Sequence, residues 1–248
     1  MRRILSLLII FLAALSVFST ERIVVAVMQD PDFLDPHRAA ASGTYEMMFN
    51  VFEGLLKPDS KGNVIPAIAE SYSISPDGLV YTFKLREGVK FHNGKEVTMN
   101  DVLYSLNRLK GSGEVRGLSS DFEKFVSKIE AIGDRTVEIT LNTLNTDFLD
   151  KFINAIIPAD NPDHERNPIG TGPFKFVAYQ PGQRVVIAKF NEYWNPDLPL
   201  VDEVEFRIIP DNQAALMSFM AGEVQMLPRL DAIQADILMG RYNLISAE

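Results

Sequence analysis

The sequence predicts a mixed α/β fold in which a strand-rich insert interrupts a second domain. Two observations predict this fold class. Short apolar strand patterns and helical patterns both recur along most of the 248 residues. Apolar residues make up 46% of the chain and charged residues 23%, a balance typical of globular proteins that excludes disordered, collagenous and coiled-coil classes.

The charge and the cysteine content narrow the classes of partner and chemistry. The chain has 33 acidic and 24 basic residues, so its formal net charge is −9 at neutral pH. Because such a chain repels phosphate backbones, we expect no nucleic-acid partner. The chain has no cysteine, which excludes disulfides, thiolate metal sites and cysteine nucleophiles.

The N-terminal segment has the pattern of a cleavable secretory signal. Arg2 and Arg3 precede an uncharged run over residues 4–18, which as a helix would be about 22 Å long, short of a hydrocarbon core of ~30 Å. Because Val17 and Ser19 are small, we expect residues 1–19 to be a signal peptide and the protein to be periplasmic or secreted. No cysteine follows the run, so we expect no lipid anchor. The alternative is an uncleaved membrane anchor.

The first elements after this segment are a strand, a loop and a helix. Residues 22–28 form a near-continuous apolar run of the kind that is buried on both faces of a sheet. Pro31 and Pro36 then predict an irregular loop. Residues 44–56 carry apolar side chains at helical spacing and predict a helix.

The middle of the chain begins with a hairpin and a capped helix. Residues 72–74 and 79–85 predict two strands that flank Ser75-Pro-Asp-Gly78, a turn sequence with proline and glycine at the positions a hairpin needs. Thr98 and Asp101 have the spacing of a capping box, which predicts that a helix begins there.

The remaining elements complete the insert and return to the interrupted domain. Strands are predicted at residues 129–132, 136–141, 174–179, 185–190 and 204–209, a short helix at 146–153 and an amphipathic helix at 212–221. The order of elements places the insert at residues 52–160, inside a domain formed by residues 20–51 and 161–248.

The sequence carries no convincing catalytic or cofactor motif. His37, His92 and His164 lie far apart, and none has a partner at metal-ligand spacing in a convincing helix. We expect each histidine at the surface or in a loop. We therefore assign no catalytic residue, no metal site and no cofactor.

Three acids in the loop after the first strand have two interpretations. Asp30, Asp32 and Asp35 can hold a cation or the amine or hydroxyls of a ligand, or they can fix turns and helix ends. A structural role is favoured for Asp35, and both interpretations stay open for Asp30 because ligands in α/β sheets bind just beyond the carboxyl ends of strands. We expect Trp194 to pack a corner between strands rather than stack on a ligand.

Several segments together resemble the family 5 extracellular solute-binding proteins. The motifs that carry the resemblance most strongly are residues 69–78, 79–88, 89–101 and 102–106. Further motifs of the family are Leu34-Asp-Pro36, Phe52-Glu-Gly-Leu-Leu56, Gly170-Thr-Gly-Pro-Phe174, Asn191-Glu-Tyr-Trp194 and Ala221-Gly-Glu-Val224. They occur in the order that the family has, from about Ile23 to Arg229. The members of this family are the dipeptide, oligopeptide, nickel and oligosaccharide receptors of ABC importers.

The resemblance implies a periplasmic-binding-protein-like fold of type II with an extra strand-rich subdomain. Residues 20–51 and 161–248 would form the ligand-binding lobe, and residues 52–160 the inserted subdomain. The full-length protein would be a monomer that captures a peptide or oligosaccharide and delivers it to an ABC permease in the membrane. By similarity to loops that face the cleft in relatives, the expected ligand-binding residues are Met28, Gln29, Asp30, Asp32, Met226, Leu227 and Arg229.

The sequence departs from the family at its C-terminal end. Relatives continue into a second lobe and then return to the first, whereas this sequence stops at Glu248. We therefore expect the first lobe only, as a fragment, a truncated chain or the product of a disrupted reading frame. Two alternative functions remain at this point: an exported hydrolase that uses two carboxylates, and a sensory or chaperone-like module that binds extended peptides.

Overall fold

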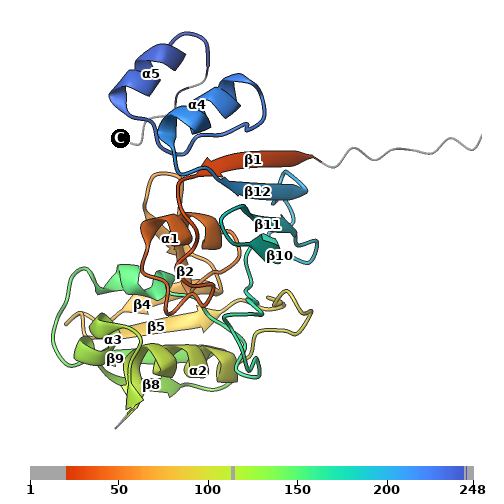
Figure 1. The fold of residues 1–248 in the computed structure, drawn as a ribbon. Helices are drawn as coiled ribbons and strands as arrows, with labels where there is room; N and C mark the ends of the chain where they lie inside the picture. Colours follow the sequence, from red (N-terminus) through yellow and green to blue (C-terminus); the bar gives the residue numbers. More distant parts are fainter. Residues whose placement is uncertain (1–20, 113–114, 243, 245–248) are drawn as a thin grey trace, which may run out of the picture.

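The computed structural model describes residues 21–112, 115–242 and 244, and two four-stranded sheets dominate it (Figure 1). The first sheet has the order β1-β12-β11-β10, from the strands Arg22–Val27, Glu203–Ile208, Arg184–Lys189 and Phe174–Gln180. The second sheet has the order β4-β5-β9-β8, from the strands Ala69–Ile74, Val80–Leu85, Thr136–Leu141 and Val126–Ala131. Each predicted strand is present, within a few residues at its ends. The predicted signal peptide lies outside the described residues.

The first sheet is mixed, since β1 pairs with β12 in parallel and the other strand pairs are antiparallel. Side chains of successive residues on β1 point to opposite faces. Val25 and Val27 pack in a core with Met47 and Met48 of α1 (Ser42–Met48). Val24 and Ala26 pack on the other face, against α4 (Asn212–Met220). The helices α1 and α4 therefore cover opposite faces of β1.

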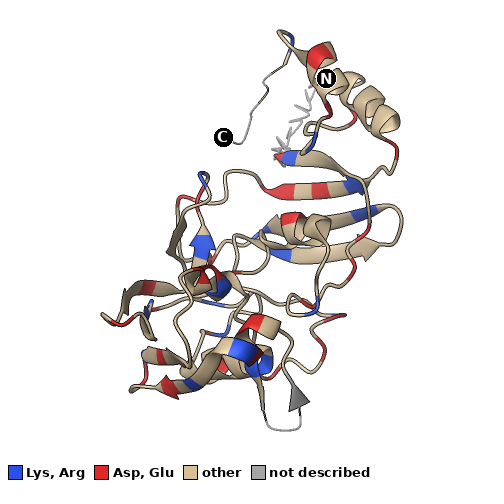
Figure 2. Cartoon of the chain, turned by 90° about the vertical axis from the view of Figure 1, so that its left-hand side faces the viewer, with Lys and Arg blue, Asp and Glu red and all other residues tan. Residues whose placement is uncertain are grey.

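The α4 face of the first sheet also carries a charged cluster. Glu205 of β12 is 2% exposed and lies beside three arginines. Arg207 Nε donates to its carboxylate at 2.9 Å, Arg184 donates at 3.3 Å and Arg22 forms a further ion pair with it. Along β12 the charged residues Glu203, Glu205 and Arg207 alternate with uncharged ones, and both signs of charge lie in this sheet (Figure 2). The cluster neutralises the buried carboxylate and ties three neighbouring strands together.

The second sheet holds the larger core. The hairpin β4–β5 turns at Gly78, whose φ is +73°, as the turn sequence predicts. The helix α2 (Met99–Lys110) begins with the predicted capping box, in which Thr98 and Asp101 bond each other's backbone N–H groups. Its buried side chains pack over the sheet with the aromatic residues Tyr81, Phe83, Phe122, Phe148 and Phe152. The predicted short helix at 146–153 is a 3₁₀ helix, η1 (Phe148–Ile153).

The remaining elements are short. They are β2 (Leu56–Pro58), β3 (Val64–Pro66), β6 (Gly111–Ser112), β7 (Val115–Arg116), α3 (Ser120–Phe125) and α5 (Ala232–Leu238). The predicted helix at 212–221 is present as α4, but Met217 and Met220 are exposed, so its apolar residues are not confined to one face. No helix in the described part of the chain combines the length and apolarity needed to cross a bilayer.

The prediction of a helix over residues 44–56 was wrong at its C-terminal end, because α1 ends at Met48. After α1, the chain crosses the segment that contains Gly170 and Gly172. The backbone carbonyl groups of residues 50 and 51 accept hydrogen bonds from that segment and not from a further helical turn. Gly172 N–H donates to Val51 O and Phe174 N–H donates to Asn50 O, both at 3.0 Å. Tertiary hydrogen bonds thus replace the helical ones, although the apolar spacing continues.

The crossing of these two segments requires glycine. A Cβ atom on Gly170 would lie 2.0 Å from Val51 O, and one on Gly172 would lie 2.6 Å from Asn50 O. Gly54, on the other segment, is equally enclosed, since its Cβ would lie 2.3 Å from Phe152 O. These contacts give a physical reason for the glycines in two of the sequence motifs: only residues without a Cβ allow the backbones to approach this closely.

The three histidines lie in turns, which is one of the two placements expected for them, and they are not at the surface. His37 and His164 are buried, and His92 is enclosed at the glycine crossing. His92 Nδ1 accepts from Gly170 N–H at 3.3 Å, and His92 Nε2 donates to Gly172 O at 3.0 Å. His37 Nε2 donates to Ala155 O at 2.8 Å. These bonds stabilise the turns. The acceptor role of His92 Nδ1 requires a neutral ring, whereas His37 is kept neutral by its burial.

Stability is expected to fall as the pH is lowered through the range in which the unfolded histidines titrate. Burial lowers the pKa of both His37 and His92 to about 4, from an ordinary value of 6.5. Below pH 6.5 the unfolded state therefore binds protons that the native state does not bind. Each histidine then lowers the free energy of unfolding by up to roughly 3 kcal/mol as the pH approaches 4. The full stabilisation is present above pH 6.5. Urea unfolding at a series of pH values measures this slope.

The variant His92→Gln tests the assignment. An amide side chain does not titrate, so the decline in stability between about pH 6.5 and pH 4.5 should become shallower than in the parent chain. Carboxylates such as Asp35, whose pKa is held below its usual 3.8, titrate at lower pH and leave this window to the histidines. An unchanged slope in the variant would contradict the assignment.

Candidate functional site

A pocket lies at the carboxyl end of β1, and we call it the β1 pocket. Its volume is about 170 Å³. Its lining comes mainly from five parts of the chain. These are the residues after β1 (Met28 and Gln29), α1 (Ser42, Gly43 and Glu46), α4 (Asn212 and Ala215), the segment Leu227, Pro228 and Arg229, and α5 (Gln234). Ligands of α/β proteins bind at this end of a strand, beyond its last residue.

Backbone hydrogen bonds bring the segment around residue 226 to the outer edge of β1. Ala26 N–H donates to Met226 O at 3.0 Å, and Val25 forms a parallel bridge with Met226. The Gln225 side chain accepts from Val24 N–H at 2.9 Å, while its own backbone N–H donates to Val24 O at 2.8 Å. Gln225 therefore has a structural role here.

The charged groups of the β1 pocket are Arg229 and Glu46. The Arg229 guanidinium donates to Ser42 Oγ at 3.3 Å and forms an ion pair with the Glu46 carboxylate. The side chains are 62% and 39% exposed, so solvent screens the pair and both groups remain accessible. A guanidinium binds carboxylates, and a carboxylate accepts from ammonium groups. Together they suit a small solute that carries both charges.

Asp30, an expected ligand-binding residue, bonds other parts of the chain and does not line the β1 pocket. Its carboxylate accepts from the Tyr179 hydroxyl at 2.9 Å and from Gly182 N–H at 2.9 Å. Burial, together with the Asp30 carboxylate, raises the pKa of Tyr179 to about 12. The Asp30 side chain therefore fixes the loop after β1 to the β10–β11 turn.

Asp32 and Asp35 also fix the loop. The Asp32 carboxylate accepts from the Thr44 hydroxyl at 2.6 Å and from the N–H groups of Ala40 and Ala41. Burial raises the pKa of Asp32, but these hydrogen bonds outweigh it and hold the pKa below its usual value. Asp35 is buried and pairs with Arg108 of α2. Its pKa is lowered too, because the Arg108 guanidinium outweighs burial.

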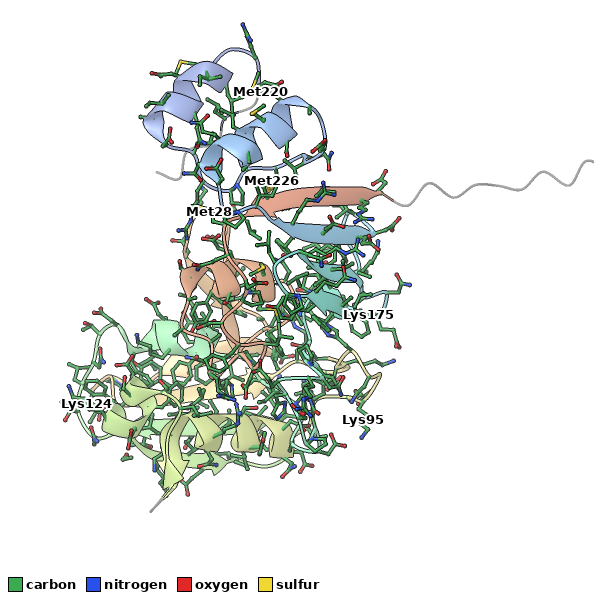
Figure 3. The ribbon with its side chains drawn as sticks, viewed as in Figure 1. Met28, Lys95, Lys124, Lys175, Met220 and Met226 are labelled. Carbon is green, nitrogen blue, oxygen red and sulfur yellow. The ribbon has the colours of Figure 1, made fainter. Side chains whose placement is uncertain are left out.

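The two methionines among the expected residues lie together at the end of β1 (Figure 3). Met28 is 50% exposed and Met226 is 49% exposed. Met28 lines the β1 pocket, whereas Met226 does not. Their flexible thioether side chains can adapt to apolar parts of different ligands.

The structure brings Met28, Gln29, Leu227 and Arg229 to one pocket, and it places Asp30, Asp32 and Met226 outside its lining. Sequence reasoning missed Glu46, Asn212 and Gln234. Polar residues on helices carry no pattern that separates a pocket position from an ordinary exposed one. The loop acids leave no free cluster for a cation, and no group of three histidines, aspartates or glutamates in the described ranges is arranged to hold a metal ion.

Glu53 is a buried carboxylate that joins two of the sequence motifs. It accepts from the Tyr193 hydroxyl at 2.6 Å, from Trp194 Nε1 at 2.8 Å and from Lys57 Nζ at 3.0 Å. Burial raises the pKa of Tyr193, and the Glu53 charge adds to that effect. The Arg86 guanidinium lies 4.1 Å from the centroid of the Trp194 ring. Trp194 packs against the core of the second sheet, in agreement with the expected packing role.

Comparison with known proteins identifies related sequences and folds. The model for the bacterial extracellular solute-binding proteins, family 5 (middle part), matches residues 63–244. The glutathione-binding protein GsiB of Pectobacterium atrosepticum is 32% identical over 235 residues, which cover 92% of this chain and 46% of the relative. 

Solved structures of proteins that bind solutes have the same fold as this chain. DppA of Helicobacter pylori in complex with the peptide STSA has a TM-score of 0.78 at 27% identity, covering 88% of this chain and 48% of that one. AgaA of A. tumefaciens in complex with agropinic acid has a TM-score of 0.79 at 30% identity, and the match covers 89% of this chain and 46% of AgaA. This chain therefore spans about half the length of the relatives it matches.

These matches confirm the predicted mixed α/β fold of a periplasmic binding protein and the predicted family. Since the family consists of extracellular proteins that bind solutes and are not enzymes, the carboxylate-based hydrolase is set aside. The family match covers well over half of the described residues, including the hairpin, α2, the segment with Gly170 and Gly172, and α4. The chain belongs to family 5 of the bacterial extracellular solute-binding proteins.

Proposed function

We propose that this chain supplies one wall of the ligand site in the solute-binding component of an ABC importer. The protein captures a peptide-like solute outside the cytoplasmic membrane and delivers it to a membrane permease. The observation that carries the proposal is the Arg229–Glu46 pair in the β1 pocket. Relatives named for binding glutathione, a peptide and agropinic acid support a solute with a carboxylate.

The ion pair favours a charged solute over an oligosaccharide. In the chain alone, Arg229 and Glu46 satisfy each other. A solute carboxylate that takes the guanidinium makes strong charge-assisted hydrogen bonds, and the freed Glu46 carboxylate can accept from the solute's ammonium group. Sugar hydroxyls carry no charge, so their hydrogen bonds compensate less for the loss of the Arg229–Glu46 ion pair.

The proposed domain division follows the sheets. All four strands of the first sheet lie within residues 20–51 and 161–248, which we propose as the ligand-binding lobe. All four strands of the second sheet lie within residues 52–160, which we propose as the inserted subdomain. The β1 pocket draws its lining from the first of these units.

The 248-residue chain alone is expected to bind glutathione weakly, with a Kd on the order of 1 mM. One wall covers far less than the roughly 70–90% of ligand surface that enclosed sites bury. NMR of the chain labelled with ¹³C at methionine methyl groups detects binding at this strength. Glutathione should shift the Met28 methyl signal, since Met28 lines the β1 pocket. The absence of any shift up to saturating glutathione would contradict the proposal.

The variant Arg229→Ala identifies the carboxylate-binding group. Its Kd for glutathione should rise roughly three- to tenfold, since a partly exposed charge-assisted hydrogen bond is lost. Arg166→Ala removes an arginine whose side chain is 89% exposed and which does not line the pocket, and its Kd should not change. Equal affinities for the parent chain and Arg229→Ala would argue against this role of the guanidinium.

A further inference from the structure

A second cavity, which we call the α1 pocket, lies along α1, between this helix and residues 150–155. Its volume is about 500 Å³, within the range of roughly 300–1,000 Å³ typical of sites for small organic ligands. Its lining is mostly apolar, and Tyr45, Met48, Phe49, Phe52 and Ile153 contribute to it. The β1 pocket, at about 170 Å³, is too small to hold such a ligand by itself.

The aromatic side chains of the α1 pocket are held in place while one of them faces solvent. The Tyr45 hydroxyl donates to Ala39 O at 2.7 Å, and the Tyr45 and Phe49 ring centroids lie 5.6 Å apart. Phe49 is nevertheless 44% exposed. A preformed apolar surface of this kind gains stability when an apolar group covers it.

The two pockets form one surface along α1. Ser42 and Glu46 line both pockets, and Phe49 lines the α1 pocket. Positions 42, 46 and 49 follow the i, i+4, i+7 spacing, which places them on one face of a helix. Arg229 lies over the N-terminal end of this face, where it bonds Ser42 and Glu46. The face therefore runs from charged groups to aromatic groups.

The length of this face sets the length of the ligand. Seven residues of α-helix rise about 10 Å, and an extended peptide advances about 3.3 Å per residue. A carboxylate at Arg229 and an apolar group at Phe49 are thus matched by an extended chain of about three residues.

We infer that the α1 pocket binds an apolar side chain of the solute whose carboxylate binds Arg229. The ligand class is a peptide of three or more residues with an apolar residue near the end opposite the carboxylate. This inference rests on the proposed function, because it takes the β1 pocket as the site of the charged end.

The experiment compares Phe-Ala-Ala with Ala-Ala-Ala on the methionine-labelled chain. The two peptides have the same length and the same terminal charges, so they differ only in the ring. Both should shift the Met28 methyl in the β1 pocket, and only Phe-Ala-Ala should shift the Met48 methyl in the α1 pocket. The ring should lower the Kd roughly tenfold, as expected for partial burial of an aromatic side chain.

Three variants test the contribution of Phe49. Phe49→Glu places a charge in the apolar lining and should bring the two Kd values to within about twofold, whereas Phe49→Leu should retain most of the preference. Leu200→Glu adds the same charge at a leucine that is 79% exposed and lines neither pocket, and it should keep the tenfold ratio. Because each ratio is measured within one variant, a modest loss of stability does not affect it.

The outcomes separate the two proposals. If both peptides shift Met28 equally while Met48 does not respond and the Kd values agree, the inference about the α1 pocket is wrong and the proposed function stands. If neither peptide shifts Met28, both fail. A Phe-Ala-Ala preference that survives Phe49→Glu would also overturn the assignment of the ring to the α1 pocket.

Discussion

Replacing Gly170 with alanine should destabilise the fold by roughly 3–5 kcal/mol or prevent folding. The added Cβ would lie 2.0 Å from Val51 O and 2.8 Å from the Phe52 ring. Neither neighbour can move freely, because the Val51 carbonyl accepts from Gly172 N–H and Phe52 is buried in the core. Urea unfolding followed by circular dichroism measures the loss.

The matched control is Gly43→Ala. Gly43 lies in α1, and its added Cβ would lie 3.3 Å from the side-chain amide of Gln29, which can rotate away. Alanine is a better helix former than glycine, so stability should change by less than about 1 kcal/mol. If Gly170→Ala were as stable as Gly43→Ala, the two segments would not cross as closely as described.

Replacing Glu53 with alanine should cost roughly 3–5 kcal/mol of stability. The substitution leaves the Tyr193 hydroxyl, the Trp194 indole N–H and the Lys57 ammonium without their shared acceptor in a buried site. The chain has a single tryptophan, so its fluorescence reports this site directly. A shift of the emission to longer wavelength should accompany the lower urea midpoint as Trp194 becomes hydrated.

Two further variants separate the charge of Glu53 from its hydrogen bonds. Glu53→Gln keeps an acceptor for the Tyr193 and Trp194 donors but leaves Lys57 without its ion pair, so its loss should be intermediate. Glu87→Ala removes a glutamate whose side chain is 79% exposed and pairs with Arg135, and it should cost less than about 1 kcal/mol. Equal losses of stability in Glu53→Ala and Glu87→Ala would show that the buried cluster stabilises the fold no more than an exposed ion pair does.

Elements with local signals could be predicted from the sequence. The β4–β5 hairpin depends on a turn of four residues, and α2 depends on a capping box that also spans four residues. The end of α1 could not be predicted in this way. It is set by the Gly170 segment, which lies more than 120 residues further along the chain and takes the carbonyl groups that a longer helix would need.

In the candidate site, too, some residues could be predicted from the sequence and others could not. The resemblance to a family pointed to the loops after β1 and after Val224, and four of the seven expected residues line the β1 pocket. Asp30 and Asp32 do not, because their oxygens accept from Tyr179 and Thr44, partners that only the folded chain supplies. Glu46 and the α1 pocket required the structure, since ordinary helix surfaces contain the same residue types.

The parallel pairing of β1 with β12 also determines the order in which the chain can fold. The second sheet closes within residues 69–141, so it can form as soon as that stretch is available. β1 must wait for β12, about 180 residues later, before its backbone groups on that side are satisfied. Such distant pairing slows folding and leaves an apolar strand available for aggregation. We therefore expect the segment 22–27 to be prone to aggregation until β12 is available to pair with it.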